Sequence, residues 1–145
     1  MDGFREWAGV LGAATVQARS ATAPMARLEM AGEGLRLVWA TAQSVESHAD
    51  VDAALVWTDL VESVAEASDD LELVSSAPPV LLGTGSGPDG SLVDTAALRQ
   101  AVQGLLTAVH AAVGAYAAEI ESGRDRLLAV LAAGKVERAV AVCAA

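Results

Sequence analysis

The sequence has few of the side chains that usually carry catalysis or bind metals. Its 145 residues include one cysteine and two histidines. A single cysteine excludes an intramolecular disulfide and a cysteine-based zinc site. Aromatic residues make up only 3% of the chain. No local pattern links a nucleophile to a base. We therefore expect no enzymatic activity and no cofactor.

The histidines do not indicate a metal site. His48, Asp50 and Asp52 lie around an expected helix start, where helix capping explains them more simply than metal binding. His110 has no Glu or His three or four residues away, so the Glu-x-x-His pattern of di-iron bundles is missing. We expect no bound metal.

Basic residues are scarce as well. Nine Lys and Arg side chains stand against nineteen Asp and Glu, which gives a formal net charge of −10. Binding nucleic-acid phosphates through bulk charge requires clustered Lys and Arg, so nucleic acid is excluded as a partner of this kind.

Long apolar runs without polar side chains are missing too. The nearest candidate for a membrane-spanning helix, residues 98–118, contains Arg99, Gln100, Gln103 and His110. The N-terminal apolar run is a poor secretory signal, because Asp2 and Glu6 spoil its positive region. We expect a cytoplasmic protein without membrane contact.

Small aliphatic residues dominate what is present. Hydrophobic residues make up 53% of the chain, and alanine is the most frequent. The length fits one domain over residues 1–145 with a real core. The abundance of Ala, Val, Arg and Gly, beside a single Lys, is typical of a bacterial genome rich in G and C.

Apolar residues recur at steps of three or four along almost the whole chain, which predicts an all-α fold. We expect helices over residues 4–20, 24–48 and 50–74, then one long helix over about 94–133 and a short terminal helix over 135–143. This arrangement is an antiparallel four-helix bundle. The alternative is a break at Gly123 that folds the last part back.

Residues 77–93 are the only long segment expected to be non-helical. Pro78 and Pro79 should end the third helix. The Gly, Ser and Pro content of the segment predicts a flexible loop, whose residues 80–82 attach to the bundle. Residues 85–90 match the G-x-G-x-x-G pattern without the strand that a dinucleotide site requires.

The charge is confined to one part of the chain. Residues 50–95 contain ten acidic side chains and no basic one. Five of them should form one stripe on the third helix: Asp59, Glu62, Glu66, Asp69 and Asp70. Such a stripe is a solvated face that keeps an apolar chain soluble, or a docking face for a basic protein. A divalent-ion site is the weakest of the three alternatives, because an open stripe does not gather the six or more oxygen ligands that calcium takes.

We therefore expect an intracellular, non-enzymatic protein–protein interaction module, such as an inhibitor or immunity-type protein, whose acidic helix binds a basic partner. A homodimer is a second expectation, because part of the long fourth helix would overhang the bundle. The alternative function is binding of a small apolar ligand in the core. Such a pocket would be lined by Trp7, Trp39, Trp57 and Tyr116.

Overall fold

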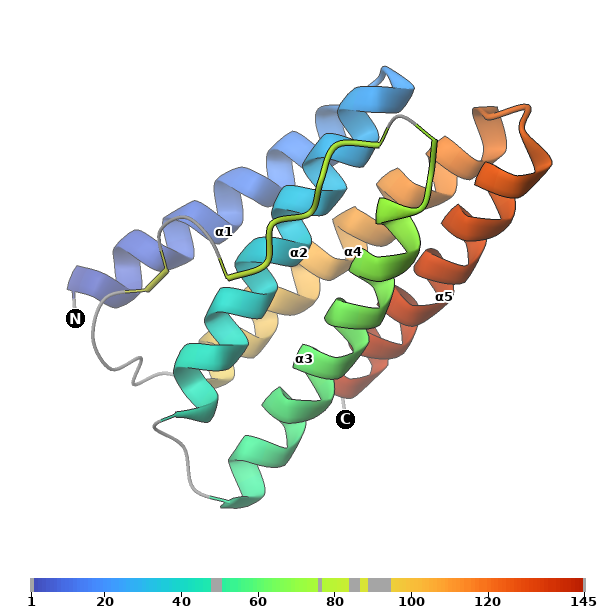
Figure 1. Ribbon diagram of the computed structural model, residues 1–145. Coiled ribbons are helices and arrows are strands. Elements are labelled where there is room, and N and C mark those ends of the chain that lie inside the picture. Colours follow the sequence, from blue (N-terminus) through green and yellow to red (C-terminus); the bar gives the residue numbers. More distant parts are fainter. Residues whose placement is uncertain (1, 48–50, 76, 84–86, 89–94, 145) are drawn as a thin grey trace.

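The computed structural model describes residues 2–47, 51–75, 77–83, 87–88 and 95–144. These residues form five α-helices and no strand, which confirms the all-α prediction (Figure 1). The helices are α1 (Asp2–Ser20), α2 (Pro24–Glu46), α3 (Val51–Glu72), α4 (Thr95–Glu119) and α5 (Gly123–Ala144).

The helices pack through the faces that the periodicity predicted. Helix α2 contacts α3 and α4, α5 contacts the same two helices, and α1 lies against α2 and α4. The core consists mainly of Leu, Val and Ala, with Trp57 and Tyr116 as its largest fully buried side chains. The apolar residues that recur at steps of three or four in α1 to α4 are therefore mainly buried, although Phe4 and Ile120, which follows α4, are only half-buried.

Gly34 allows α2 and α4 to approach closely. A Cβ atom at this position would lie 2.6 Å from Val109 Cγ2 and 3.3 Å from Leu105 Cδ1. Real Cβ atoms do not tolerate the first distance, so the two helices can only pack this tightly around a glycine.

The segment after α3 forms a strap along α2. We use this name for residues 77–83 together with 87–88, the described part of the connection to α4. Val80 is buried over Gly32, where an added Cβ would lie 3.2 Å from the valine methyl. Gly83, with a φ of 79°, packs against the Trp39 ring. The strap thus covers α2, and Figure 1 shows it running alongside that helix.

Attachment of the strap by residues 80–82 is confirmed in part, because Val80 is buried and Leu82 half-buried while Leu81 is exposed. The third helix ends at Glu72, before the prolines that were expected to stop it. Mobility of residues 77–93 stays a prediction, and residues 84–86 and 89–93 lie outside the described part of the chain.

The prediction of one long helix through Gly123 is wrong. Helix α4 ends at Glu119 and α5 begins at Gly123, and α5 packs back onto α4 and α3. Ser122 causes the break, because its hydroxyl accepts the Asp125 N–H at 3.2 Å and its carbonyl accepts the Arg126 N–H at 2.9 Å. Ser122 thereby satisfies N–H groups that the first turn of a helix leaves without partners.

Two further expectations depended on the long helix and are also wrong. In one long helix over residues 94–133, Leu127 and Leu131 would continue the apolar spacing and be buried, but they are 59% and 47% exposed. The separate terminal helix over 135–143 is also wrong, because those residues continue α5. The buried face of α5 consists instead of Asp125, Ala129, Ala132, Val136, Ala139 and Cys143.

Polar contacts join each end of α4 to a neighbouring helix. Arg99, in the first turns of α4, donates to the Cys143 carbonyl at 2.9 Å. A cation there stabilises the last turn of α5, because carbonyl groups at a helix C-terminus carry partial negative charge. At the opposite end Arg27 of α2 forms an ion pair with Glu119 of α4.

The close approach at Gly34 gives a stability prediction. Gly34→Ala should lower the free energy of unfolding by about 1–3 kcal/mol, because the new methyl group overlaps Val109. Urea unfolding followed by circular dichroism measures this change.

The matched control is Gly114→Ala on α4, where an added Cβ meets no atom within 4 Å. The control should raise the stability by about 0.5–1 kcal/mol, since alanine favours a helix over glycine. Equal stabilisation by both substitutions would contradict the close packing of α2 against α4.

Candidate functional site

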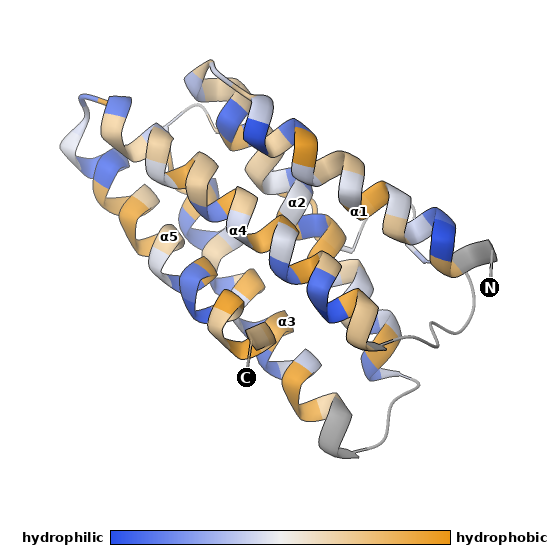
Figure 2. Cartoon of the chain, turned by 180° about the vertical axis from the view of Figure 1, so that it is seen from behind, coloured by the Kyte–Doolittle hydropathy of each residue, from blue (hydrophilic) through white to orange (hydrophobic). Residues whose placement is uncertain are grey.

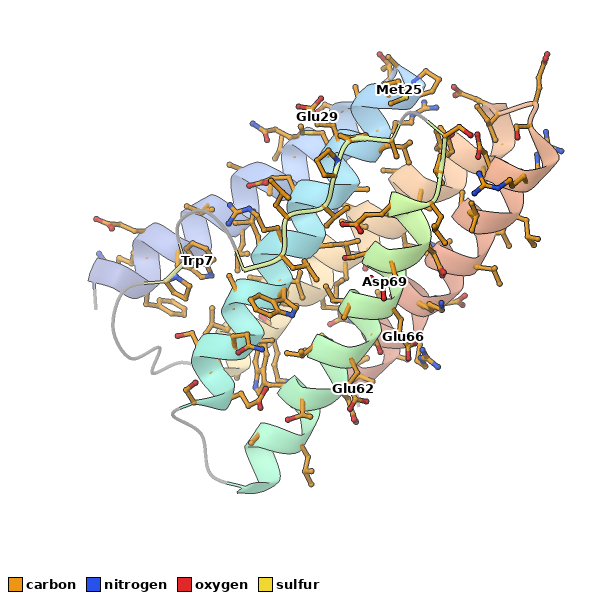
Figure 3. The ribbon with its side chains drawn as sticks, in the orientation of Figure 1. Trp7, Met25, Glu29, Glu62, Glu66 and Asp69 are labelled. Carbon is orange, nitrogen blue, oxygen red and sulfur yellow. The ribbon has the colours of Figure 1, made fainter. Side chains whose placement is uncertain are left out.

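The acidic stripe predicted on α3 lies on the surface beside α5. Asp59, Glu62, Glu66 and Asp69 are exposed, and Asp70 is half-buried. Figure 3 shows Glu62, Glu66 and Asp69 following one side of α3, the side next to α5. Their spacing of three and four residues produces this arrangement, because such residues neighbour each other on a helix.

Two of the five acids are engaged by cations of α5. Lys135 Nζ lies 2.6 Å from Asp70 Oδ2, and both side chains are at most 30% exposed. Arg138 lies 2.7 Å from Glu66, in an ion pair whose side chains are both more than half exposed. Solvent screens the second pair, which limits its contribution to at most about 1 kcal/mol. The structure thus divides the predicted stripe into neutralised and available carboxylates.

The available carboxylates gather at a hollow between the two helices. Its volume is about 310 Å³, and it is lined by Asp59, Glu62, Ser63, Glu66, Arg138 and Val142. Within the described residues no ion pair joins Asp59 or Glu62 to a cation. The hollow therefore combines three carboxylates with one guanidinium, which suits the binding of a cationic side chain.

A larger hollow of about 430 Å³ lies between α2 and the strap. Its wall carries Glu33 and Arg36, which bond to each other through two N–H donors, at 3.0 and 2.8 Å. This hydrogen bonding, opposed by burial, raises the pKa of Arg36 above its usual value. With Glu29 this lining holds two carboxylates and one guanidinium, whereas the hollow beside α3 holds three carboxylates and one guanidinium and is therefore the better candidate for a cationic partner.

The aromatic residues proposed to line a ligand pocket lie apart from these hollows. Trp7 is buried, and its Nε1 donates to Thr41 Oγ1 at 2.7 Å. Trp57 and Tyr116 are fully buried, whereas Trp39 is half-buried under the strap. None of the four lines the two hollows above or a third one beside Arg99. Ligand binding between these aromatic rings stays a prediction.

Asp125 is a buried carboxylate that the sequence did not single out. It is 4% exposed, and its Oδ1 accepts the Ser75 N–H at 3.1 Å, which joins the end of α3 to the start of α5. Its position in the first turn of α5 also suits its negative charge. The motif Ser122-x-x-Asp125 resembles the capping pattern, and that signal could have located the helix start.

Two buried groups have shifted acidities. Burial raises the pKa of the Tyr116 hydroxyl above its usual value, and the negative charge of Asp125 raises it further. Burial raises the pKa of the Cys143 thiol to about 11, although the nearby Arg99 acts in the opposite direction. Both side chains therefore remain protonated at neutral pH, which leaves neither of them ready to act as a nucleophile.

Among the described residues no three His, Cys, Asp or Glu side chains are grouped to hold a metal ion. The proposed capping residues His48 and Asp50 lie outside the described part. Residues 96–119 of α4 are long and apolar enough to cross a membrane, with a mean hydropathy of 1.3, but half of this window is buried in the protein, as in a core helix.

Comparison with protein-family models gives no matching family. Comparisons with curated proteins and with solved structures also give no match to this chain.

Asp125 should matter for stability. Asp125→Ala leaves the Ser75 N–H without its acceptor and removes a charge-assisted hydrogen bond, so we expect a loss of about 1–3 kcal/mol in the free energy of unfolding. Asp69→Ala on the exposed face of α3 is the control, and it should change the stability by less than about 0.5 kcal/mol. Equal effects in urea unfolding would show that the junction contributes nothing.

Cys143 gives a prediction on pH. Because folding raises the thiol pKa from 9.0 to about 11, the native thiolate fraction at pH 8 is roughly 100-fold smaller than in the unfolded chain. Alkylation by iodoacetamide at pH 8 should slow by at least this factor relative to protein in urea.

The raised pKa of Cys143 also makes the stability of the folded protein depend on pH. The folded state binds the proton more tightly, so the thiol's contribution is complete below pH 9 and is lost as the pH rises towards 11. A native alkylation rate equal to that of the unfolded chain would contradict the burial of Cys143.

Proposed function

We propose that this chain is a non-enzymatic interaction module that binds a basic protein through the outer face of α3. One observation carries the proposal. Asp59, Glu62 and Glu66 line one hollow, in a segment of the chain that has no Lys or Arg. A partner that presents Arg or Lys side chains would find carboxylate acceptors there at the spacing of a helix.

The chemistry of the hollow supports a protein partner. Val142 contributes an apolar patch, and Arg138 holds Glu66 in place at 2.7 Å. Interfaces commonly combine an apolar centre with charged groups that steer and orient the partner. An inhibitor or immunity-type protein that neutralises a basic partner in a bacterial cytoplasm fits this chemistry.

The helix contacts support the finer fold proposal as well. Helices α2, α3, α5 and α4 contact one another in a closed ring, and α1 lies outside it against α2 and α4. We propose that the ring is an antiparallel four-helix bundle with α1 as an additional helix. In this arrangement α3 and α5 are neighbours, which positions the acidic hollow between them.

The experiment reverses charge on the proposed face. Asp59→Lys/Glu62→Lys/Asp69→Lys alters three exposed carboxylates and retains the Glu66–Arg138 ion pair. The probes are a short arginine-rich peptide, studied by fluorescence anisotropy, and cell extract, studied by pull-down. Binding of the peptide should weaken by at least about tenfold, equivalent to about 1.4 kcal/mol, and should fall as salt is added.

A variant of equal net charge separates a located face from bulk charge. Glu6→Lys/Glu29→Lys/Glu121→Lys also alters three exposed acids, and in both variants −10 + 6 gives −4. The control should bind within about threefold of the unmodified protein. Equal loss in both variants, or no loss in either, would refute the proposed face.

A further inference from the structure

Three of the large aliphatic side chains of α5 lie on its outer surface, although Val136 is buried and Leu128, Val140 and Val142 pack against the core. Its buried face is rich in alanine, whereas Leu127 is 59%, Val130 53% and Leu131 47% exposed. A surface helix normally presents its most apolar stripe to the core and charged residues to solvent. The outer stripe follows steps of three and four residues, so its side chains form one continuous apolar surface.

A glycine lies in the same stripe, one turn further along. Gly134 is exposed, and a Cβ atom added there would meet nothing within 4 Å. Another helix can approach the backbone closely at this point, because no side chain projects from it. Helix α5 also lies at one edge of the molecule (Figure 1), and hydrophobic residues occur along much of its length (Figure 2).

Charged residues border the stripe in a pattern that complements itself. Arg126 and Glu137 lie on the same side of α5, eleven residues or about three turns apart. Both are exposed, and a hydrogen bond from Arg126 to the Ile120 carbonyl holds the guanidinium beside the stripe. The remaining cation on this face, Arg138, is neutralised by Glu66.

We propose that α5 pairs antiparallel with α5 of a second copy of the chain. With Val130 placed over Gly134 of the second copy, the twofold axis passes near residue 132, and the contact occurs twice. Leu127 then lies opposite Glu137 of the second copy, which brings that carboxylate beside Arg126. The projecting Val130 thus meets the space at Gly134, and Arg126 meets a carboxylate of opposite charge.

These pairings favour a second copy over an unrelated protein. One helix carries both the projecting valine and the receiving glycine, and both the arginine and the glutamate, so a twofold axis satisfies all of them. The contact is small, because α5 has 22 residues and is about 33 Å long. A contact of this size predicts a reversible dimer with a dissociation constant in the micromolar range.

This surface adjoins the acidic hollow at Arg138, which lines the hollow, and salt distinguishes the two. Burial of aliphatic side chains drives the dimer, and each copy carries a net charge of −10. Added salt screens the repulsion between copies, so the dimer should hold or strengthen as salt increases. Binding of a basic peptide to α3 should weaken under the same conditions, so either proposal can fail without the other.

Sedimentation velocity tests the dimer with the full chain. Protein concentrations from about 1 to about 200 μM bracket a micromolar dissociation constant. Over this range the mean mass should rise from 14.7 kDa towards twice that value. Leu127→Ser/Leu131→Ser should raise the dissociation constant at least about tenfold. The control, Val16→Ser/Leu55→Ser, alters aliphatic residues of similar exposure on α1 and α3 and should leave it unchanged.

Two further variants test the register. Gly134→Ala should raise the thermal midpoint of the monomer, because alanine favours a helix, and should still weaken the dimer. Glu137→Arg should also weaken it, and Arg126→Glu added to Glu137→Arg should restore it. A chain that stays monomeric at the highest concentration would overturn the proposal, as would a dimer that none of the α5 variants affects. A monomer that binds lipid vesicles through Leu127 and Leu131 would overturn it too.

Discussion

The contact of α2 with α4 at Gly34 is the constraint on which the rest of the structure depends. A core filled mostly with Ala, Val and Leu can only be dense if the helix backbones come close together. The missing side chain of Gly34 allows that distance, because a Val109 methyl group lies 2.6 Å from the position that a Cβ atom would take. Helix α1 rests on this pair and α5 on α4, so the position of the α3–α5 surface follows from the same contact.

The sequence predicted most of the buried helix faces but not the break between α4 and α5. Periodicity identified the buried faces of α1 to α4, because each face repeats over several turns. It failed at Gly123, where Leu127 and Leu131 continue the spacing of α4 across the break by coincidence. Periodicity records the direction of a side chain around a helix and carries no information on whether the axis continues. The Ser122-x-x-Asp125 pattern contained that information.

The acidic residues were predicted to share a stripe, and they do, but their neighbours could not be predicted. Asp70 meets Lys135 and Glu66 meets Arg138 only because α5 folds back beside α3. Both pairs join residues more than sixty positions apart. The long helix expected from the sequence would have separated them. Because α5 lies beside α3, part of the acidic stripe lines a hollow between the two helices. Asp59 and Glu62 line this hollow without an ion pair to any described residue.

The strap that crosses α2 has a spectroscopic consequence. Trp7 and Trp57 are buried in the core, whereas Trp39 is half-buried and packs against Gly83. The three indoles therefore report on different events. Emission from Trp7 and Trp57 responds to loss of the core, and a quencher such as acrylamide reaches Trp39 first. Release of the strap would change the accessible fraction of the fluorescence while the helices remain folded, so the intact protein carries its own optical probe of this segment.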